Sequence, residues 1–478
     1  MNYPIFIKVL GILLTIEGIG MILPLFISLY YDSSDSLAFI ISIILNLFIG
    51  FIMYKIPVIK HEIKIKEAFG IVSIGWVLIS VFGALPFVIS KSVPSFIDGF
   101  FEMVSGFTTT GSTIINNFAS LPPGILFWRT FSHWIGGMGI LVFTVAVLPA
   151  LGIGSYYIFR AEIPGPIKDR IVPRIKDTAK ILYLTYIGMT LVEIVLLKIG
   201  GMGLYDAIIH TFGTIGTGGL STRNESIASF NSNFITIVIT IFMVLSAINF
   251  STYHQLLKGN WKKFFKNEEL RFFLFILITS TIFITINLGG NFLNTLKNAL
   301  FQTSSIMSTT NFTIQDYTKW PVFSKSILIM LMFLGGCAGS ISGGIKNIRI
   351  LVLLKLIKRE ITKIFHPRAV IPIKINGKSL SSDEITSIMS FFVLYIVIIS
   401  LGTIVISIEG FDLITSSSAI IASLGNIGPG FGLVGPTQNY GQFSNFSKIF
   451  LSFLMLLGRL ELFSVLMLFN PKFWTDSI

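Results

Sequence analysis

Four short stretches of this chain combine threonine, asparagine and glycine in a pattern that suits the binding of a dehydrated cation. They align without a gap as "DGFFEMVSGFTTTGST" (98–113), "DAIIHTFGTIGTGGLS" (206–221), "NALFQTSSIMSTTNFT" (298–313) and "TSSSAIIASLGNIGPG" (415–430). An ion that crosses a bilayer must exchange its water shell for other oxygens, and rings of backbone carbonyls can supply them. Glycine suits such a strand because it adopts positive φ without steric cost, and a threonine hydroxyl can stabilise the strand or bind the ion. The four stretches therefore predict the walls of a cation filter.

Each stretch opens with a small polar residue and carries a second distinctive residue 13 positions later. The polar residues are typical caps of a helix N-terminus, so each stretch should begin as a short helix and end as an extended strand. For one copy alone, glycines that only let helices pack closely are the simpler explanation, but four aligned copies favour the filter. The opening residues are Asp98, Asp206, Asn298 and Thr415, and the later residues are Gly111, Gly219, Asn311 and Gly428.

The rest of the chain consists mainly of segments that could cross a membrane. Of its 478 residues, 53% are hydrophobic and 12% are charged, and the mean hydropathy is +0.82. Soluble domains carry about 25% charged residues, so this composition indicates a polytopic membrane protein. Spanning helices need about 20 apolar residues, and shorter apolar segments fit buried half-helices. We expect spans at 5–30, 37–54, 69–90, 124–150, 180–199, 232–256, 271–289, 323–358, 384–407 and 447–470, and half-helices at 95–107, 203–214, 293–307 and 412–424.

The basic residues set the expected orientation. The connections 55–67, 159–180, 258–271 and 346–384 carry 4, 6, 5 and 9 Lys and Arg residues, whereas the connections that hold the half-helices carry few. The positive-inside rule then predicts a multi-pass protein of the cytoplasmic (inner) membrane with both termini in the cytoplasm. The net charge of +12 is spread over these loops, so we expect no nucleic-acid partner.

A fourfold internal repeat organises the predicted elements, because the order span, half-helix, glycine strand and span occurs four times. The expected fold is an all-α polytopic membrane protein with four pseudo-symmetric repeats around one central pore, preceded by an extra helix pair. The C-terminal ends of the half-helices would point to the pore axis, and their negative dipoles favour a cation there. The expected divisions are 1–66 for the helix pair, and 67–158, 159–257, 258–358 and 359–478 for the repeats.

Six motifs together resemble the Trk/Ktr/HKT superfamily of potassium transporters, and most closely its TrkH-type subunits. The likeness covers essentially the whole chain, and the motifs occur in the order and topology of that superfamily. They are "SGFTTTGST" (105–113), "FWRTFSHWIGGMGILVF" (127–143), "GTGGLST" (216–222), "GGCAGSISGGIKNIRI" (335–350), "NIGPGFG" (426–432) and "MLLGRLELF" (455–463).

The resemblance implies potassium uptake through a gated pore, with one pore in each protomer of a homodimer. It also implies a cytoplasmic nucleotide-binding regulator of the TrkA kind, and no cofactor in this chain besides K⁺ as the transported ion. The filter residues that it implies are Thr109, Thr110 and Gly111; Thr217, Gly218 and Gly219; Thr309, Thr310 and Asn311; and Asn426, Ile427 and Gly428.

Asn311 departs from the superfamily pattern, which has glycine at this position. Asn is the non-glycine residue that adopts positive φ most readily, so a filter strand is still expected there. In some plant members, a serine in place of a filter glycine accompanies sodium transport. A sodium-permeable or sodium-coupled transporter is therefore the alternative function, and a transport-inactive membrane scaffold or sensor is a more remote one.

The run "LGGCAGSISGGIK" (334–346) interrupts the predicted eighth span with five glycines and two serines. Such a cluster can be a helix kink, but each glycine costs a helix about 1 kcal/mol relative to alanine. Non-helical backbone at membrane depth is tolerated where it lines a cavity. We expect 335–345 to be an intramembrane gate loop beneath the filter, as the resemblance also implies. The gate residues are Gly335, Gly336, Gly339, Ser340, Ser342, Gly343 and Gly344, together with Arg459.

Three further polar residues lie in apolar surroundings. Arg459 falls in the middle of a predicted span, where a charge is costly and by default functional. A pair with Glu461 is the alternative, although residues two apart do not face each other on a helix. Arg129 could reach the membrane interface or pair with an acidic residue, and we interpret His210 as structural.

Several kinds of active site find no support in the residues. The chain has no GxxxxGK[ST] motif, so we expect no ATP hydrolysis. Its five histidines and one cysteine show no metal-ligand spacing, and no nucleophile with a convergent base is apparent. We therefore do not expect an enzyme.

Overall fold

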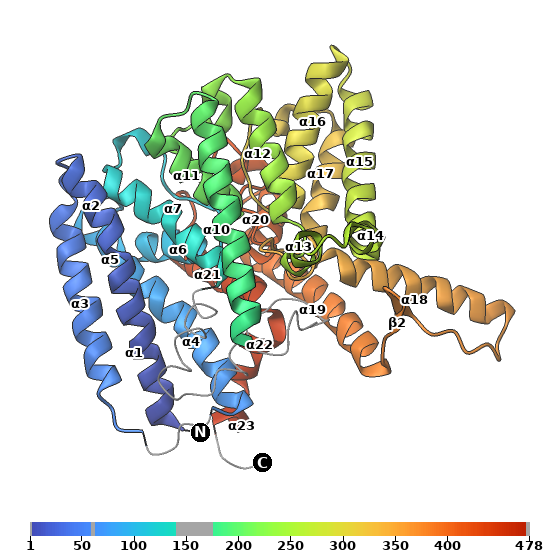
Figure 1. Ribbon diagram of the computed structural model, residues 1–478, viewed down its shortest axis with the longest axis horizontal. Helices are drawn as coiled ribbons and strands as arrows, with labels where there is room; N and C mark the ends of the chain where they lie inside the picture. Colours follow the sequence, from blue (N-terminus) through green and yellow to red (C-terminus); the bar gives the residue numbers. More distant parts are fainter. Residues whose placement is uncertain (1, 59–62, 140–174, 475–478) are drawn as a thin grey trace.

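The computed structural model describes residues 2–58, 63–139 and 175–474. It is a bundle of α-helices with one small β-hairpin, which agrees with the predicted all-α class (Figure 1). The first three helices form the predicted N-terminal pair of spans, in which α1 and α2 together make the first span and α3 packs along α1. Their bounds are α1 Tyr3–Gly20, α2 Ile22–Tyr30 and α3 Ser36–Tyr54.

Glycines let α1 and α3 approach closely. A Cβ on Gly11 would lie 2.7 Å from the carbonyl oxygen of Gly50, and a Cβ on Gly50 would lie 2.8 Å from that of Gly11. Small residues drive helix association in membranes because they permit such close contact. This contact fixes the pair as one unit beside the repeats.

The four predicted repeats follow in order, each with a long helix, a short helix, an extended segment and another helix. Repeat 1 holds α4 Ile65–Gly83, α5 Leu85–Ile89, α6 Phe96–Phe107, η1 Phe118–Ser120 and α7 Pro123–Met138; repeat 2 holds α10 Ile175–Ile199, α11 Leu204–Ile215, η3 Ser226–Phe230 and α12 Asn233–Ser246, followed by α13 Phe250–Leu257. The short helix α14 Trp261–Lys266 begins repeat 3. Repeat 3 holds α15 Glu268–Leu288, α16 Phe292–Met307, η4 Tyr317–Lys319, α17 Val322–Leu334 and α18 Asn347–Phe365; repeat 4 holds α19 Ser382–Ser407, α20 Leu413–Leu424, η5 Gly432–Val434 and α21 Asn445–Arg459, followed by α22 Leu462–Leu466, η6 Met467–Phe469 and α23 Pro471–Trp474.

The four predicted half-helices are confirmed as α6, α11, α16 and α20, and each begins within one residue of its predicted start. The predicted caps were wrong: Asp98, Asp206 and Thr415 lie in the first turn, and Asn298 lies well inside α16. Three of these helices are capped by side chains that precede them. The capping residues are Ser95, Asn291 and Asp412, which accept from the backbone amides of Asp98, Asn294 and Thr415.

Six of the ten predicted spans correspond to helices that are long and apolar enough to cross a membrane. The prediction of a continuous span at 232–256 was wrong, since the helix breaks between α12 and α13. The predicted span at 447–470 is not one continuous helix, because α21 and the following helical segment meet at a bend of 120°. The expected interruption of 323–358 is present between α17 and α18, and the span at 124–150 lies partly outside the described residues.

The ends of the described chain lie together at one end of the bundle (Figure 1). The Tyr3 hydroxyl donates to the carbonyl of Trp474 at 3.4 Å, and Lys66 Nζ donates to the carbonyl of Lys472 at 3.4 Å. The start of α1 and the residues of α23 therefore lie close together.

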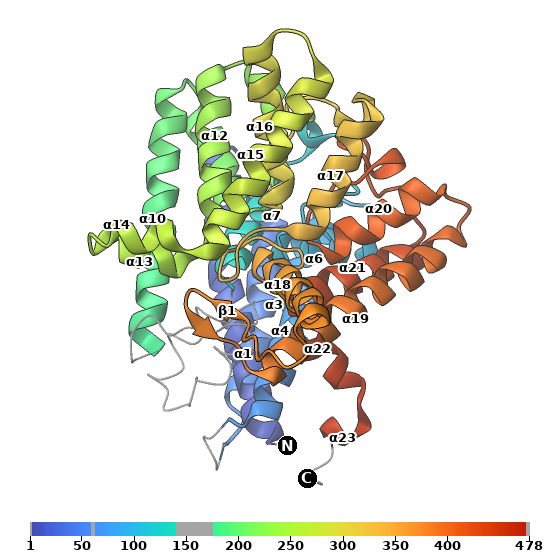
Figure 2. The same cartoon turned by 90° about the vertical axis from the view of Figure 1, so that its right-hand side faces the viewer.

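Two cores hold the described helices. The larger one runs through the four repeats, and a smaller cluster joins α18, α19 and the segment that carries the antiparallel hairpin of β1 (Lys374–Ile375) and β2 (Lys378–Ser379). Figure 1 shows α18 extending away from the other helices, and Figure 2 shows α13 and α14 lying across the direction of α10.

Candidate functional site

An extended segment follows each half-helix, at residues 109–111, 217–219, 309–311 and 426–428; we call these aligned segments 1 to 4. In each of them the first and third residues have positive φ, and the middle residue does not. Positive φ is rare for a β-branched residue, yet threonine adopts it in three of the four segments. Strain that recurs at equivalent positions is typical of functional sites. The φ values are 54°, 56°, 58° and 50° for Thr109, Thr217, Thr309 and Asn426, and 80°, 60°, 77° and 102° for Gly111, Gly219, Asn311 and Gly428.

The aligned segments lie against one another in the order of the chain. Where the third residue is glycine, a Cβ added to it would meet the carbonyl oxygen of the middle residue in the next segment. Glycine is therefore required both for its φ and for space at these three positions. The contacts run from Gly111 to Gly218, from Gly219 to Thr310, and from Gly428 to Thr110, the last at 2.7 Å.

Asn311 is the third residue of segment 3, and it places a side chain where the other segments have none. Its Nδ2 donates to the carbonyl oxygen of Gly111, in segment 1, at 3.4 Å. A Cβ added to Gly428, in segment 4, would also meet the Asn311 amide. The amide group thus contacts two other segments at the third position.

Asn426 uses its side chain differently, although it is also an asparagine at positive φ. Its Nδ2 donates to Thr110 Oγ1 at 3.0 Å and to the carbonyl oxygen of Met455 at 2.8 Å. Segment 4 is therefore tied to segment 1 and to α21.

A buried ion pair supports segment 1 and decides between the two interpretations of Arg129. Arg129 Nε lies 2.8 Å from Glu102 Oε2, and both side chains are only 1% exposed. Glu102 Oε1 accepts from Thr113 Oγ1 and from the Ile114 amide, both at 2.7 Å. Arg129 therefore pairs with an acidic residue and does not reach the membrane interface.

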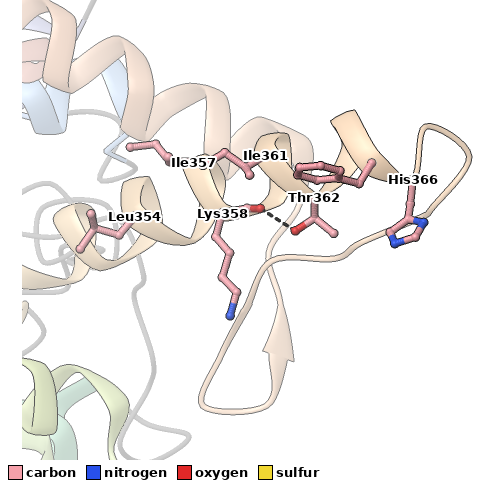
Figure 3. A pocket seen from close by; sticks show the side chains of 7 residues that line it. Leu354, Ile357, Lys358, Ile361, Thr362 and His366 are labelled. Atoms are coloured by element: carbon pink, nitrogen blue, oxygen red, sulfur yellow. Dashed lines mark hydrogen bonds between the residues drawn. The ribbon is translucent and has the colours of Figure 1, made fainter.

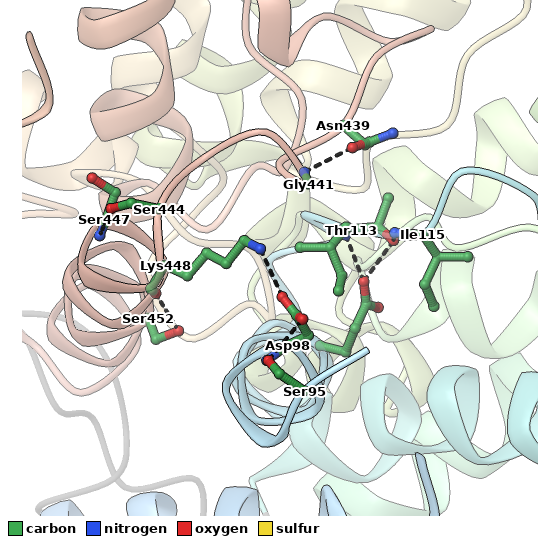
Figure 4. A network of polar contacts seen from close by, with 12 residues as sticks. Ser95, Asp98, Thr113, Ile115, Asn439, Gly441, Ser444, Ser447, Lys448 and Ser452 are labelled. Atoms are coloured by element: carbon green, nitrogen blue, oxygen red, sulfur yellow. Dashed lines mark hydrogen bonds and ion pairs between the residues drawn. The ribbon is translucent and has the colours of Figure 1, made fainter. Parts of the chain in front are cut away.

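A second buried pair joins α6 to α21. Lys448 Nζ donates to Asp98 Oδ1 at 2.7 Å, and Ser95 Oγ donates to Asp98 Oδ2 at 2.8 Å (Figure 4). Asp98 opens the first of the aligned stretches, so its carboxylate fixes this half-helix against the last repeat.

His133 packs directly behind segment 2. A Cβ added to Gly218 would overlap the His133 ring, which explains a glycine where segments 1 and 3 have threonine. His210 agrees with its structural interpretation, since its Nδ1 lies 2.7 Å from the Asp206 carbonyl and its Nε2 lies 2.9 Å from Ser221 Oγ.

The loop 335–346 contains the predicted gate loop 335–345 and the following Lys346, and it contacts segment 3 and the residue before segment 4. The Gly343 amide donates to Thr309 Oγ1 at 2.8 Å, and the Gly344 amide donates to the carbonyl of Gly425 at 2.9 Å. Asn347 closes the base of the loop, because its Nδ2 donates to the carbonyl of Gly335 at 2.6 Å.

Arg459 ends α21 and reaches the same loop, so its predicted mid-span position was wrong. Its Nη1 donates to the carbonyl of Ile341 at 2.7 Å, and its Nη2 donates to those of Gly136 and Gly137 at 2.6 and 3.0 Å. Glu461 forms an ion pair with Arg349.

Lys346 is a functional candidate that the sequence interpretation missed. It is 3% exposed, has a φ of 77°, and donates from Nζ to the carbonyl of Ser342. Arg459 and Lys346 therefore bind adjacent carbonyls of one loop. The signal in the sequence was a lysine directly after the glycine run, where a buried charge needs a partner.

The described part of the chain contains no group of three or more His, Cys, Asp or Glu side chains that could hold a metal ion. The aligned segments contain no carboxylate, and the oxygens that they offer to an ion are mainly those of backbone carbonyls and threonine hydroxyls. Such ligands suit a hard cation that is bound weakly enough to leave again.

Comparison with known proteins places this arrangement in a family. The family model for TrkH, described as a cation transport protein, matches residues 37–476. The chain belongs to the TrkH family. It is 38% identical, over the full length of both chains, to the Trk system potassium uptake protein TrkH of Salmonella typhimurium. It is also 35% identical to TrkG of Escherichia coli K12, covering 97% of each chain.

A solved structure supports the same family. The crystal structure of the potassium transporter TrkH from Vibrio parahaemolyticus is similar with a TM-score of 0.89 and 35% sequence identity, covering 99% of this chain and all of that one. The predicted fold class and superfamily are therefore confirmed. Membership of a transport family also agrees with the expectation that the chain is not an enzyme.

Proposed function

We propose that the chain carries K⁺ into the cell through a pore between its four repeats. The observation that carries this proposal is the backbone geometry of the aligned segments. The first and third residues of each segment have positive φ and the middle residue does not, so one strained backbone conformation occurs four times. The chain's TrkH relatives, which it matches over the full length, are potassium uptake proteins. Since the C-terminal ends of the four half-helices precede the aligned segments, their negative dipoles stabilise a cation there.

The aligned segments form the selectivity filter in this proposal. Carbonyl oxygens of successive residues replace the water shell of the ion, and the residues at the third position set the spacing between neighbouring segments. The proposed ligands are Thr109, Thr110, Gly111, Thr217, Gly218, Gly219, Thr309, Thr310, Asn311, Asn426, Ile427 and Gly428.

The loop 335–346 and the positively charged side chains of Lys346 and Arg459 form the gate. Arg459 and Lys346 hold neighbouring loop carbonyls, so positive charge lies beside the loop that contacts the filter. A fixed positive charge opposes the passage of a cation. Either the loop or these two side chains must therefore move before K⁺ can pass. The loop residues of the proposed gate are Gly335, Gly336, Gly339, Ser340, Ser342, Gly343 and Gly344.

Passive ⁸⁶Rb⁺ uptake into proteoliposomes tests the filter. Gly219→Ala should abolish uptake, because the new Cβ would collide with the carbonyl of Thr310. Gly410→Ala is the matched control, since Gly410 also has positive φ, at 85°, but has nothing within 4 Å of an added Cβ. Equal uptake by both variants would refute the filter assignment.

The same assay tests the gate. Arg459→Ala should raise uptake by the chain without its regulator, because it removes the guanidinium group that binds the carbonyl of Ile341 in the loop. Arg359→Ala is the control, since Arg359 pairs with Glu360 on α18 and touches no loop residue. Unchanged uptake by Arg459→Ala would contradict its role in the gate.

Sodium transport is the second candidate function, and Asn311 is the observation that favours it. Its amide already bonds to one carbonyl of the third filter position, which leaves fewer oxygens for a large ion. Rescue of a potassium-uptake-deficient bacterium, with Na⁺ and Rb⁺ in competition, distinguishes the two ions. Membrane insertion without rescue, in the presence of the native regulator, would instead favour the scaffold or sensor.

The apolar face of α18 supports a homodimer. Its residues Leu354, Ile357, Ile361 and Phe365 are 49–75% exposed and line one pocket on the helix. Figure 3 shows the first three of them on α18. A second copy of this chain is the occupant that we propose. Ile361→Asp should convert the detergent-solubilised protein from a dimer to a monomer, and an unchanged mass would refute this interface.

We also propose a cytoplasmic nucleotide-binding regulator of the TrkA kind, a location in the cytoplasmic membrane, and cytoplasmic termini. The basic connections 258–271 and 346–384 are candidate docking loops, and the connection 159–180 lies mostly outside the described residues. Copurification of the regulator should be lost when these loops are neutralised. The repeat boundaries that we propose remain 1–66, 67–158, 159–257, 258–358 and 359–478.

A further inference from the structure

Two neighbouring glutamates begin α15, and the inner one connects the loop 335–346 to the start of α18. Glu269 is 5% exposed. Its Oε1 accepts from the Ala338 amide at 2.6 Å and from the Ile348 amide at 3.1 Å. One carboxylate oxygen therefore bridges the first part of the loop and the first turn of α18.

The outer glutamate holds the surface elements beside the loop. Glu268 Oε1 accepts from the Asn376 amide at 2.8 Å, and the Glu268 amide donates to Asn376 Oδ1 at 2.9 Å. Glu268 Oε2 also accepts from Lys355 Nζ of α18. The first turn of α15 is thus bound to the tip of the β1–β2 hairpin on one side and to the loop on the other.

Apolar contacts connect the same elements independently. Ala338 of the loop belongs to the small hydrophobic cluster that also contains Val352 of α18 and Ile373 and Ile375 from the hairpin segment. A displacement of the hairpin would therefore act on the loop through packed side chains as well as through the two glutamates.

The far side of the loop touches the proposed filter, where the Gly343 amide donates to Thr309 Oγ1. We propose that Glu269 is a positioning residue that keeps the gate loop closed, and that Glu268 and the hairpin tip are the attachment through which contacts at the membrane surface move it. The inference rests on the proposed gate, and it adds the element that controls the gate.

The chain supplies its own probe of the loop. Cys337 is the only cysteine in the sequence, it lies next to Ala338, and it is 2% exposed. The rate at which a small maleimide labels Cys337 in the purified full-length protein reports how often the loop opens. ⁸⁶Rb⁺ uptake by the same preparation in proteoliposomes reports whether opening conducts ions.

We expect Glu269→Ala to label at least about tenfold faster than the wild type and to show raised uptake, because it removes a charged acceptor of two backbone amides. Glu269→Gln keeps an acceptor oxygen and should stay closer to the wild type. Glu268→Ala should give an intermediate rate, since it releases only the surface attachment.

Glu384→Ala is the matched control, because Glu384 accepts from the Ser381 amide at the start of α19 and does not touch the loop. Unchanged labelling of Glu269→Ala with an unchanged melting temperature would overturn the positioning role. Faster labelling without any change in uptake would leave that role intact and refute the gate. If Glu269→Ala does not fold, Glu268→Ala is the variant that tests the proposal. A rate of Cys337 labelling in Glu268→Ala equal to that of the wild type would overturn the surface attachment.

Discussion

Replacing Asn311 tests whether its side chain competes with the transported ion. The Asn311 amide donates to the carbonyl oxygen of Gly111 at 3.4 Å, which is longer than a typical N–H···O bond of about 2.7–3.2 Å. We therefore take the lower part of the range for a net hydrogen bond, about 0.5–1 kcal/mol. An ion that binds the Gly111 oxygen competes with this amide for the electron density of that oxygen.

Asn311→Gly removes the competitor and restores the third glycine. The free energy of the lost bond corresponds to a fall of about two- to fivefold in the K⁺ concentration for half-maximal uptake. The preference for K⁺ over Na⁺ should rise as well, because selectivity depends on the number of coordinating carbonyls. The melting temperature should not fall, since glycine adopts a φ of 77° more easily than asparagine.

Asn311→Asp separates charge from shape. It keeps the size of the side chain but replaces the donor with an acceptor, which repels the Gly111 oxygen and attracts any cation. We expect tighter binding of both ions and weaker discrimination between them.

The assay is ⁸⁶Rb⁺ uptake into proteoliposomes over a range of K⁺ and Na⁺ concentrations. Asn231→Gly is the control, because Asn231 also has positive φ, at 45°, but lies at the end of η3 outside the aligned segments. A half-maximal concentration and an ion preference that both stay at wild-type values in Asn311→Gly would refute the competition.

Three further substitutions test the supports around the pore. Glu102→Gln leaves the buried Arg129 without its charged partner and should cost about 3–5 kcal/mol of stability, which thermal unfolding in detergent would show as a lower midpoint. Gly218→Ala should abolish uptake because its Cβ overlaps the His133 ring, and the double variant with His133→Ala should recover uptake; no recovery would contradict the steric cause. Burial raises the pKa of Glu409, but hydrogen bonds from two serine hydroxyls and one backbone amide outweigh it and hold that pKa below the ordinary value. Its contribution to stability is therefore present above the unfolded-state pKa and is lost as the pH falls through the folded one, so the drop in melting temperature on acidification should be smaller in Glu409→Gln.

The repeat architecture could be predicted from the sequence because its signals are local. Long apolar runs, short apolar segments and glycine-rich strands each occupy one contiguous stretch, and the same order recurs four times. Even Asn311 was recognisable as the odd member, since the alignment alone assigned it to a position that needs positive φ.

The breaks after α12 and after α21 could not be predicted, because distant partners cause them. The carbonyl of Ala247, at the end of α12, accepts from the amide of Cys337 in the gate loop at 2.8 Å. Glu461 has a φ of 62° and pairs with Arg349, which belongs to α18. Neither α12 nor α21 carries a local stop signal such as proline at these breaks.

The partners of buried charges were missed for the same reason. Glu102 and its partner Arg129 lie on different helices, so their pairing could not be read from the sequence. Glu269 falls within the predicted basic connection 258–271, and only the fold brings it to two amides of the gate loop and the start of α18.

Two departures from fourfold symmetry lie together in repeat 3. An ion on the axis requires equivalent oxygens from all four repeats, whereas a gate needs one repeat that differs. Within the described residues, the hydroxyls of Thr109 and Thr217 have no hydrogen-bond partner, while that of Thr309 accepts from Gly343 of the loop.

Segment 3 also contains Asn311, two residues after Thr309, and the loop that interrupts its outgoing helix is bound by Glu269 at the start of the same repeat. A movement of this loop must therefore change the hydrogen bonding of segment 3 first. Asn311 lies on that segment and donates to the carbonyl of Gly111 in segment 1. We therefore expect opening of the gate to be coupled to release of the Gly111 carbonyl from the Asn311 amide.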